Sequence, residues 1–120
     1  MVTIETVRQI ALSFDEAVEL PHFDLISFRV KKKIFATLDE KTRIAALKFS
    51  QVDQSVFIDI SKGAFYPAQG AWGKSGYTYV DLKKVSSAML RDAMNTSYEN
   101  VVLPQRRKGT EKITQRIKTR

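Results

Sequence analysis

Cysteine is absent from the sequence, and its absence excludes two kinds of structure at once. Without thiols the chain can form neither a disulfide framework nor a thiolate metal site. The 120 residues must therefore hold together by burying a hydrophobic core, which a chain of this length can do as one domain. The lack of cysteine also agrees with a reducing compartment, so we expect the protein in the cytoplasm.

Histidine is nearly absent as well, which leaves little material for catalysis or metal binding. The only histidine is His22, and a lone histidine of this kind is more often structural than part of a site with a neighbour such as Asp24. Gly-Lys-Ser at 73–75 is no P-loop, because it lacks the spacing from an earlier glycine and precedes a predicted strand. We therefore expect no enzyme, no cofactor and no metal site.

Long apolar runs are missing too. No stretch approaches the ~20 apolar residues that a membrane helix needs. The N-terminal residues MVTIETVRQI lack the basic-then-apolar order of a signal peptide. We expect no membrane association.

Net charge is nearly absent from most of the chain and is concentrated at its C-terminal end. Residues 105–120 hold seven Lys and Arg against one Glu, a net charge of +6, which leaves +1 of the formal +7 for residues 1–104. The sequence therefore predicts a near-neutral domain over 1–104 and a basic C-terminal tail over 105–120. Such a tail either meets a polyanion or simply adds solubility.

Alternating polar and apolar residues predict strands in the first half of the chain. The pattern runs through HFDLISFRV, KKKIFATLD and TRIAALKFS, which follow one another between positions 22 and 50. The polar joints at 31–33 and 39–42 are so short that neighbouring strands must be antiparallel. We therefore predict a three-stranded meander, preceded by an acidic connector, DEAVELP, at 15–21.

Two helices are expected on either side of this meander. Thr3 can cap an amphipathic helix at 4–13, and Ser50 can cap a helix at 51–61. The second segment could instead be a strand, because 56–60 is rich in β-branched residues.

The last part of the chain predicts one more strand and one more helix. YTYVDL at 77–82 alternates like a strand, and Ser86 can cap a final helix from about 87 that Pro104 ends. The predicted order is α-β-β-β-α-β-α, an α+β fold with an antiparallel sheet.

The segment FYPAQGAWGKSGYTYVDL at 65–82 gathers the only tryptophan and three of the five glycines. Glycines allow turns with positive φ, and rings in such a loop more often cover the core than face solvent. We therefore predict a structural clasp, in which replacing Trp72 by alanine costs about 3–5 kcal/mol. The alternative is that the rings stack on unpaired bases. The predicted clasp residues are Phe65, Tyr66, Trp72, Gly73 and Gly76.

Two segments together resemble the MmcQ/YjbR family of small bacterial proteins. They are PHFDLISFRVKKKIFATLD at 21–39 and FYPAQGAWGKSGYTYVDL at 65–82, and the likeness extends over about residues 1–107. The family often has Trp where this chain has Tyr77, and the tail beyond Lys108 is longer than is typical.

The resemblance implies a mixed α+β domain with helices packed on one side of an antiparallel sheet. The family is described as carrying a double-wing DNA-binding motif and is similar in shape to frataxin-like proteins, which makes DNA the expected partner. Frataxin-like proteins bind iron through an acidic first helix, but 4–13 contains only Glu5 as an acid. Iron binding is therefore not expected here.

Clustered cations are the candidate DNA-binding residues. Four of the five residues at 29–33 are basic and lie at a predicted joint between strands, where they could meet phosphates or simply discourage edge pairing. The final helix carries only Arg91 as a cation, so no recognition helix is expected. We predict weak, salt-sensitive, sequence-tolerant binding; the alternative is a protein-interaction adaptor using the open sheet face and the tail. The candidate residues are Arg29, Lys31, Lys32, Lys33, Lys74, Arg106, Arg107 and Lys108.

Overall fold

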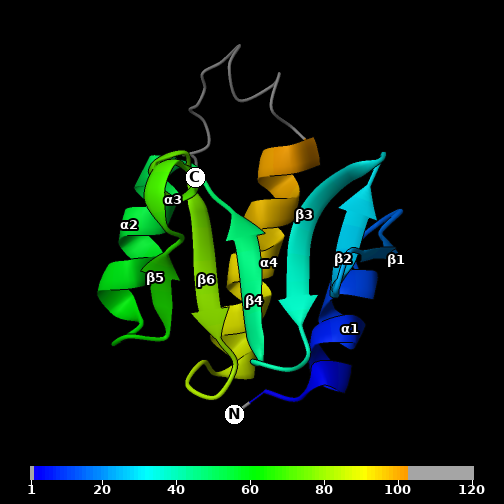
Figure 1. The fold of residues 1–120 in the computed structure, drawn as a ribbon, viewed down its shortest axis with the longest axis horizontal. Coiled ribbons are helices and arrows are strands. Elements are labelled where there is room, and N and C mark those ends of the chain that lie inside the picture. Colours follow the sequence, from blue (N-terminus) through cyan, green and yellow to red (C-terminus); the bar gives the residue numbers. More distant parts are fainter. Residues whose placement is uncertain (1, 103–120) are drawn as a thin grey trace.

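A six-stranded antiparallel sheet organises the protein, and the computed structural model describes residues 2–102 of it (Figure 1). The strands lie in the order β1-β2-β3-β4-β6-β5, so β6 pairs with β4 and β5 takes the edge. In chain order the elements are α1 (Ile4–Leu12), β1 (Val18–His22), β2 (Leu25–Val30), β3 (Lys33–Asp39), β4 (Ile44–Lys48), α2 (Gln51–Ile60), β5 (Phe65–Pro67), α3 (Gly70–Lys74), β6 (Tyr77–Asp81) and α4 (Ser87–Val102).

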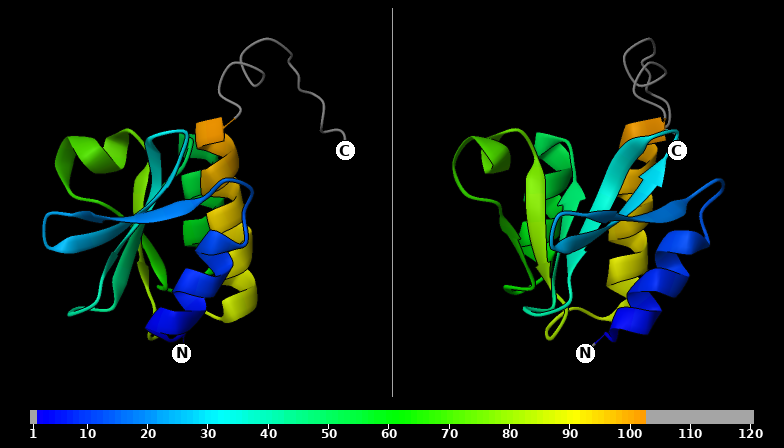
Figure 2. Two further views of the ribbon diagram at one scale, coloured as in Figure 1. Left: turned by 90° about the vertical axis from the view of Figure 1, so that its right-hand side faces the viewer. Right: turned by 45° about the vertical axis from the view of Figure 1, so that its right-hand side comes forward.

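Three helices cover one face of this sheet. α4 crosses β2, β3 and β4, α1 lies beside α4, and α2 lies against β5 (Figure 2). The short helix α3 lies against β6. The prediction of an α+β fold with an antiparallel sheet and helices on one side is confirmed.

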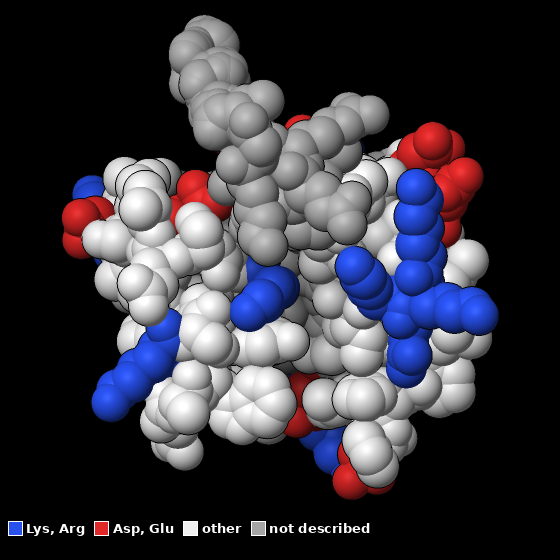
Figure 3. All heavy atoms as spheres, turned by 90° about the horizontal axis from the view of Figure 1, so that it is seen from above, with Lys and Arg blue, Asp and Glu red and all other residues white. Residues whose placement is uncertain are grey.

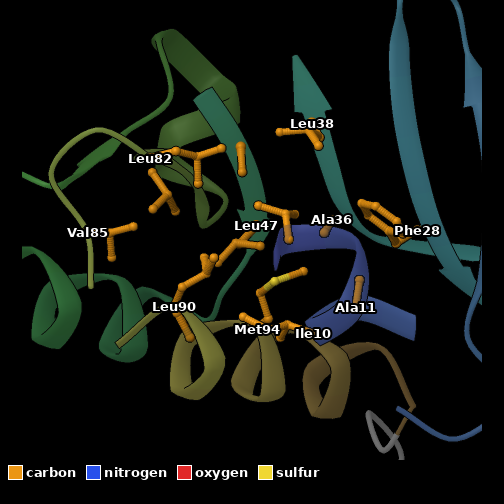
Figure 4. Packing of buried hydrophobic residues seen from close by; sticks show 14 of the residues in the cluster. Ile10, Ala11, Phe28, Ala36, Leu38, Leu47, Leu82, Val85, Leu90 and Met94 are labelled. Carbon is orange, nitrogen blue, oxygen red and sulfur yellow. The ribbon is translucent and has the colours of Figure 1, made fainter. Parts of the chain in front are cut away.

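The core fills the space between the sheet and α4. Leu90 and Met94 project from α4 toward Leu47 of β4, and all three side chains are fully buried (Figure 4). Burial of this kind contributes about 2–5 kcal/mol for each large aliphatic side chain, judged by truncation to alanine. Beside α2 the core continues as three rings with centroids 5.0–6.5 Å apart: Phe49, Phe57 and Phe65.

The predicted helix starts are confirmed by their caps. The hydroxyls of Thr3, Ser50 and Ser86 each accept a hydrogen bond from the backbone N–H three residues later, at 3.0–3.1 Å. Each bond satisfies one of the N–H groups that a helix start leaves unpaired. The strand alternative for the second segment is wrong, because Gln51–Ile60 is a helix.

The predicted order omitted three short elements, β1, β5 and α3. β1 lies where a connector was expected at 15–21; it pairs only with β2, and such an edge strand tolerates Pro21. β5 has three residues, too few to show alternation. α3 has five residues, two of them glycine, which is a poor helix former.

Candidate nucleic-acid interface

The sheet opens at one end, because β3 and β4 pair along only part of their length. Backbone pairing runs from Asp39↔Ile44 to Ala36↔Leu47, and beyond this point the two strands diverge (Figure 1). The β2–β3 pairing contains a β-bulge in which Phe35 has no partner on β2. A bulge of this kind bends a strand, so the β2–β3 hairpin curves away from β4.

α4 supplies hydrogen bonds that the diverging strands no longer exchange. The hydroxyl of Ser97 donates to the carbonyl of Phe35 at 2.6 Å and accepts from the N–H of Lys48 at 2.8 Å. The side-chain amide of Asn100 lies 3.4 Å from the carbonyl of Lys48. Ser97 is fully buried, so the helix satisfies both strands and stabilises the opening between them.

This opening is a hollow of about 720 Å³, which we call the basic hollow. Among residues 2–102, none of those that line it is acidic, and four of them carry a positive charge. Figure 3 looks onto this end of the molecule and shows basic side chains on it, with acidic ones mainly toward the rim. The lining residues are Arg29, Lys32, Lys33, Ile34, Lys48, Phe49, Ser50, Ser75, Tyr77, Asn100 and Val101.

The β2–β3 hairpin places lysines on the rim of the hollow through an unusual turn. Val30 pairs with Lys33, so Lys31 and Lys32 form a two-residue turn, with φ of 52° and 70°. Such turns favour Asn-Gly, because other L residues in this left-handed region cost roughly 1–2 kcal/mol each. Two lysines stand here despite that cost. Four other non-glycine residues in the described chain have φ of 54–63°, so the strain by itself does not mark the turn as a site.

Lys48 is a cation of the hollow that was not among the predicted site residues. It ends β4 and pairs with Tyr77 of β6, and its ammonium lies 4.7 Å from the centre of the Tyr77 ring. The same ammonium donates to the carbonyl of Ser75 at 3.1 Å. Alternation alone could have placed Lys48 on the face of the sheet that α1, α2 and α4 leave uncovered, which we call the open face. Its approach to Tyr77 depends on the β4–β6 pairing.

The predicted hairpin cations lie together and are not neutralised by neighbouring acids. Within the described part of the chain, no ion pair joins Arg29, Lys31, Lys32 or Lys33 to a carboxylate. Arg29 donates instead to the hydroxyl of Ser27 at 2.9 Å, which orients its guanidinium along β2. These groups therefore keep their charge for an external anion.

Two ion pairs among the described residues lie in another part of the domain. Arg8 of α1 lies 3.2 Å from Glu19 and 3.8 Å from Glu40. Burial, followed by the nearby carboxylates of Asp15 and Glu16, raises the pKa of Tyr98, whose hydroxyl donates to the carbonyl of Asp15. None of these groups lines the basic hollow.

Lys74 is not among the described lining residues of the hollow. Lys74 ends α3, and its carbonyl accepts a hydrogen bond from the Gln51 side chain at 2.7 Å, which ties α3 to the start of α2. Arg106, Arg107 and Lys108 lie outside the described residues, as does the predicted tail at 105–120.

Among the predicted clasp rings, Phe65 is buried but Trp72 is not. The prediction that Trp72 covers the core is wrong: its side chain is 67% exposed, and its ring meets Tyr77 edge-on at 5.3 Å. Tyr66 is also exposed and lies against Tyr79. Replacing Trp72 by alanine therefore leaves no buried cavity, and the expected cost of 3–5 kcal/mol does not apply.

Two of the clasp glycines allow backbones to approach each other closely. A Cβ at Gly73 would collide with the carbonyl oxygen of Ala68, and a Cβ at Gly76 would collide with that of Phe49. Gly76 also has φ of +112°, a conformation essentially restricted to glycine. The turn between α3 and β6 therefore packs directly onto the end of β4.

The other end of the open face is also hollowed, but the described residues that line it include no Lys or Arg. It measures about 380 Å³ and includes Thr37, Asp39, Tyr66 and Tyr79. His22 lies elsewhere, with its ring 4.8 Å from that of Phe23. Residues 2–102 contain no group of three or more His, Asp or Glu placed to hold a metal ion.

Within the same described range, the longest helix has 16 residues, and none is both long and apolar enough to cross a membrane.

Comparison with solved structures identifies the fold. The crystal structure of Deinococcus radiodurans protein DR2400, whose domain is described as DUF419, superposes with a TM-score of 0.75 at 18% sequence identity. The alignment covers 98% of this chain and 88% of that protein. Comparison with curated proteins gives no match.

Comparison with protein families gives a match that covers most of the chain. The family described as YjbR matches residues 12–100, which include the β2–β3 hairpin, the glycine-rich turn around Trp72 and nearly all of α4. The sequence motifs, the fold and this match agree, and the chain belongs to the YjbR family.

Proposed function

We propose that this protein binds nucleic acid at the basic hollow, weakly, with little dependence on sequence and without catalysis. The β2–β3 hairpin acts as the wing that the family resemblance implies, and its lysines contact phosphates. The single observation that carries the proposal is that Arg29, Lys32, Lys33 and Lys48 converge on one hollow, with no acid among the lining residues that the structure describes. A location in the cytoplasm is part of the same proposal.

The number of available cations sets how steeply the affinity is expected to fall with salt concentration. Each phosphate contact on duplex DNA contributes about −0.9 to the slope of log affinity against log salt concentration. Three to five contacts, the number we expect, therefore give a slope of roughly −3 to −5. Binding of this kind reads the backbone rather than base edges, so different sequences of equal length should bind alike.

Fluorescence anisotropy of the full chain with labelled DNA at several salt concentrations tests the proposal. The hairpin variant carries Lys31→Glu, Lys32→Glu and Lys33→Glu. Its matched control carries Lys41→Glu, Lys83→Glu and Lys84→Glu, three exposed lysines away from the hollow. Both variants change the net charge equally, so only the position of the charges differs.

We expect the hairpin variant to lose at least tenfold in affinity and to flatten the salt slope, while the control keeps most of its binding. Equal losses in both variants would mean that general charge, not this site, attracts the DNA. Absence of binding by the unaltered chain at low salt would end the proposal.

An adaptor that binds another protein is the second candidate, and a specific surface favours it. Val18 and Leu20 of the edge strand β1 are each nearly half exposed, and Phe23 in the following turn is 93% exposed. Exposed apolar side chains on an edge strand suit a protein partner. Stoichiometric co-purification of one protein, lost on Phe23→Ser, would support this candidate over DNA.

A further inference from the structure

Trp72 is an exposed ring on a rigid support. The single tryptophan of the chain is 67% exposed, although a side chain of this kind normally contributes to a core or an interface. Its only ring contact among the described residues is the edge-on approach to Tyr77 at 5.3 Å and 75°. Much of the indole surface therefore remains available to another planar group.

The helix that carries Trp72 is held in place by its neighbours. The side-chain amide of Gln54 donates to the carbonyl of Gly73 at 3.0 Å, and that of Gln51 donates to the carbonyl of Lys74 at 2.7 Å. The hydroxyl of Ser75 donates to the carbonyl of Trp72 at 2.9 Å. The ring therefore stands on a preorganised turn, which lowers the entropy cost of using it to bind.

Trp72 is connected to the basic hollow through Tyr77. Tyr77 contacts Trp72 with one part of its ring and lies 4.7 Å from the Lys48 ammonium, and both Tyr77 and Lys48 line the hollow. The exposed indole thus borders the hollow on the side where Tyr77 and Lys48 line it. A ligand that uses both must present an unshared planar ring next to negative charge.

We propose that the ligand is single-stranded nucleic acid, an inference that rests on the function proposed above. Its phosphates lie at Arg29, Lys32, Lys33 and Lys48, and an unpaired base stacks on Trp72. In a duplex the interior bases are stacked on both faces, so only the two terminal base pairs offer a face to the indole without unpairing. Aromatic platforms beside a basic groove are the general means of binding single strands without reading sequence.

The intrinsic fluorescence of Trp72 gives a direct test with three probes at low salt. They are a 12-nucleotide oligothymidylate, an abasic strand of the same length and charge, and a 12-base-pair duplex. We expect the oligothymidylate to quench the tryptophan emission and to bind 5- to 150-fold more tightly than the abasic strand, corresponding to about 1–3 kcal/mol. The abasic strand and the duplex should bind without comparable quenching.

A variant pair separates stacking from charge. Trp72→Ala should lower the affinity for oligothymidylate to that of the abasic strand and leave abasic binding unchanged, whereas Trp72→Phe should restore part of the difference. Tyr66→Ala is the matched control, since Tyr66 is also exposed but lines the hollow of about 380 Å³, which has no Lys or Arg among its described lining residues. These affinities are read by anisotropy, because the tryptophan is removed.

The outcomes separate this inference from the proposal on which it rests. Equal affinity for thymidylate and abasic strands, or equal quenching by the duplex, would overturn the stacking role of Trp72 while leaving phosphate binding intact. If no probe binds at low salt, the nucleic-acid function itself fails. Loss of affinity in Tyr66→Ala equal to that in Trp72→Ala would also overturn the inference.

Discussion

Alternate residues of β4 and β6 face opposite sides of the sheet and meet different surroundings. On the covered face, Leu47 and Val80 are fully buried. On the open face, Lys48 and Tyr77 are neighbours across the strands and line the basic hollow. The same two strands therefore serve two purposes. Their buried side chains stabilise the domain, and their solvent-exposed side chains determine what it can bind.

The open face itself changes along its length. Where β3 and β4 diverge, four cations line a hollow of about 720 Å³. Where they are paired, the hollow of about 380 Å³ includes Asp39 and, among its described lining residues, no basic one. The contrast arises because the β2–β3 turn and the end of β4, which carry the lysines, lie where β3 and β4 diverge, whereas the paired part of the sheet exposes only every second side chain.

Gly76→Ala should have the largest effect on folding. The added Cβ meets a backbone carbonyl of Phe49 that belongs to the end of β4, and the residue must also keep φ at +112°. We expect a loss of about 4 kcal/mol or more, measured by urea denaturation. Gly70→Ala is the control for the collision, since Gly70 also has a positive φ (61°) but a Cβ there meets nothing within 4 Å; it should cost less than Gly76→Ala. A mild loss at Gly76 would mean that the start of β6 can move away from β4.

Leu90→Ala sharpens the contrast between the two faces. Leu90 is fully buried beneath the sheet, so its truncation should cost about 2–5 kcal/mol in the free energy of unfolding. Trp72→Ala removes a larger but exposed side chain and should cost less than about 1 kcal/mol. Similar costs at both positions would contradict the separation of packing from binding.

Ser97→Ala tests how α4 holds β3 and β4 apart. Without the hydroxyl, the carbonyl of Phe35 and the N–H of Lys48 lose their buried partner, which should cost about 1–3 kcal/mol. Thr96→Ala, on the adjacent position of the same helix, should change stability by less than about 0.5 kcal/mol. We also expect weaker DNA binding in Ser97→Ala, because the rim of the hollow is no longer fixed.

The hairpin turn should show the smallest effect on stability, and with the opposite sign. Changing Lys31→Asn together with Lys32→Gly supplies the residues that a two-residue turn prefers, and should raise the free energy of unfolding by about 1 kcal/mol. The same change removes two cations and should weaken DNA binding. Greater stability with unchanged binding would show that the strained lysines do not serve the site.

Much of the scaffold could be predicted from local pattern. Alternation predicted β2, β3 and β4, and the hydroxyls at positions 3, 50 and 86 marked the helix starts, because both signals depend on residues close together in the chain. β1 escaped prediction because an edge strand needs little alternation and accepts Pro21.

The candidate site could be predicted only in part. Arg29 and the three lysines were visible because they are neighbours in the sequence. Lys48 was missed because its place beside Tyr77 depends on pairing between strands that α2, β5 and α3 separate in the chain. The exposure of Trp72 was missed because nothing local says which side of a five-residue helix faces the core.

The sequence by itself determined the strands of the meander, the starts of the helices, the basic hairpin turn and the family, since each depends on residues near one another along the chain. Only the tertiary structure decided that β3 and β4 diverge, that Lys48 lines the same hollow as the hairpin cations, and that Trp72 lies against Tyr77 with its ring exposed to solvent. The physical reason is that these positions follow from the packing of α4 through Ser97 and from the β4–β6 pairing, contacts whose partners are far apart in the chain.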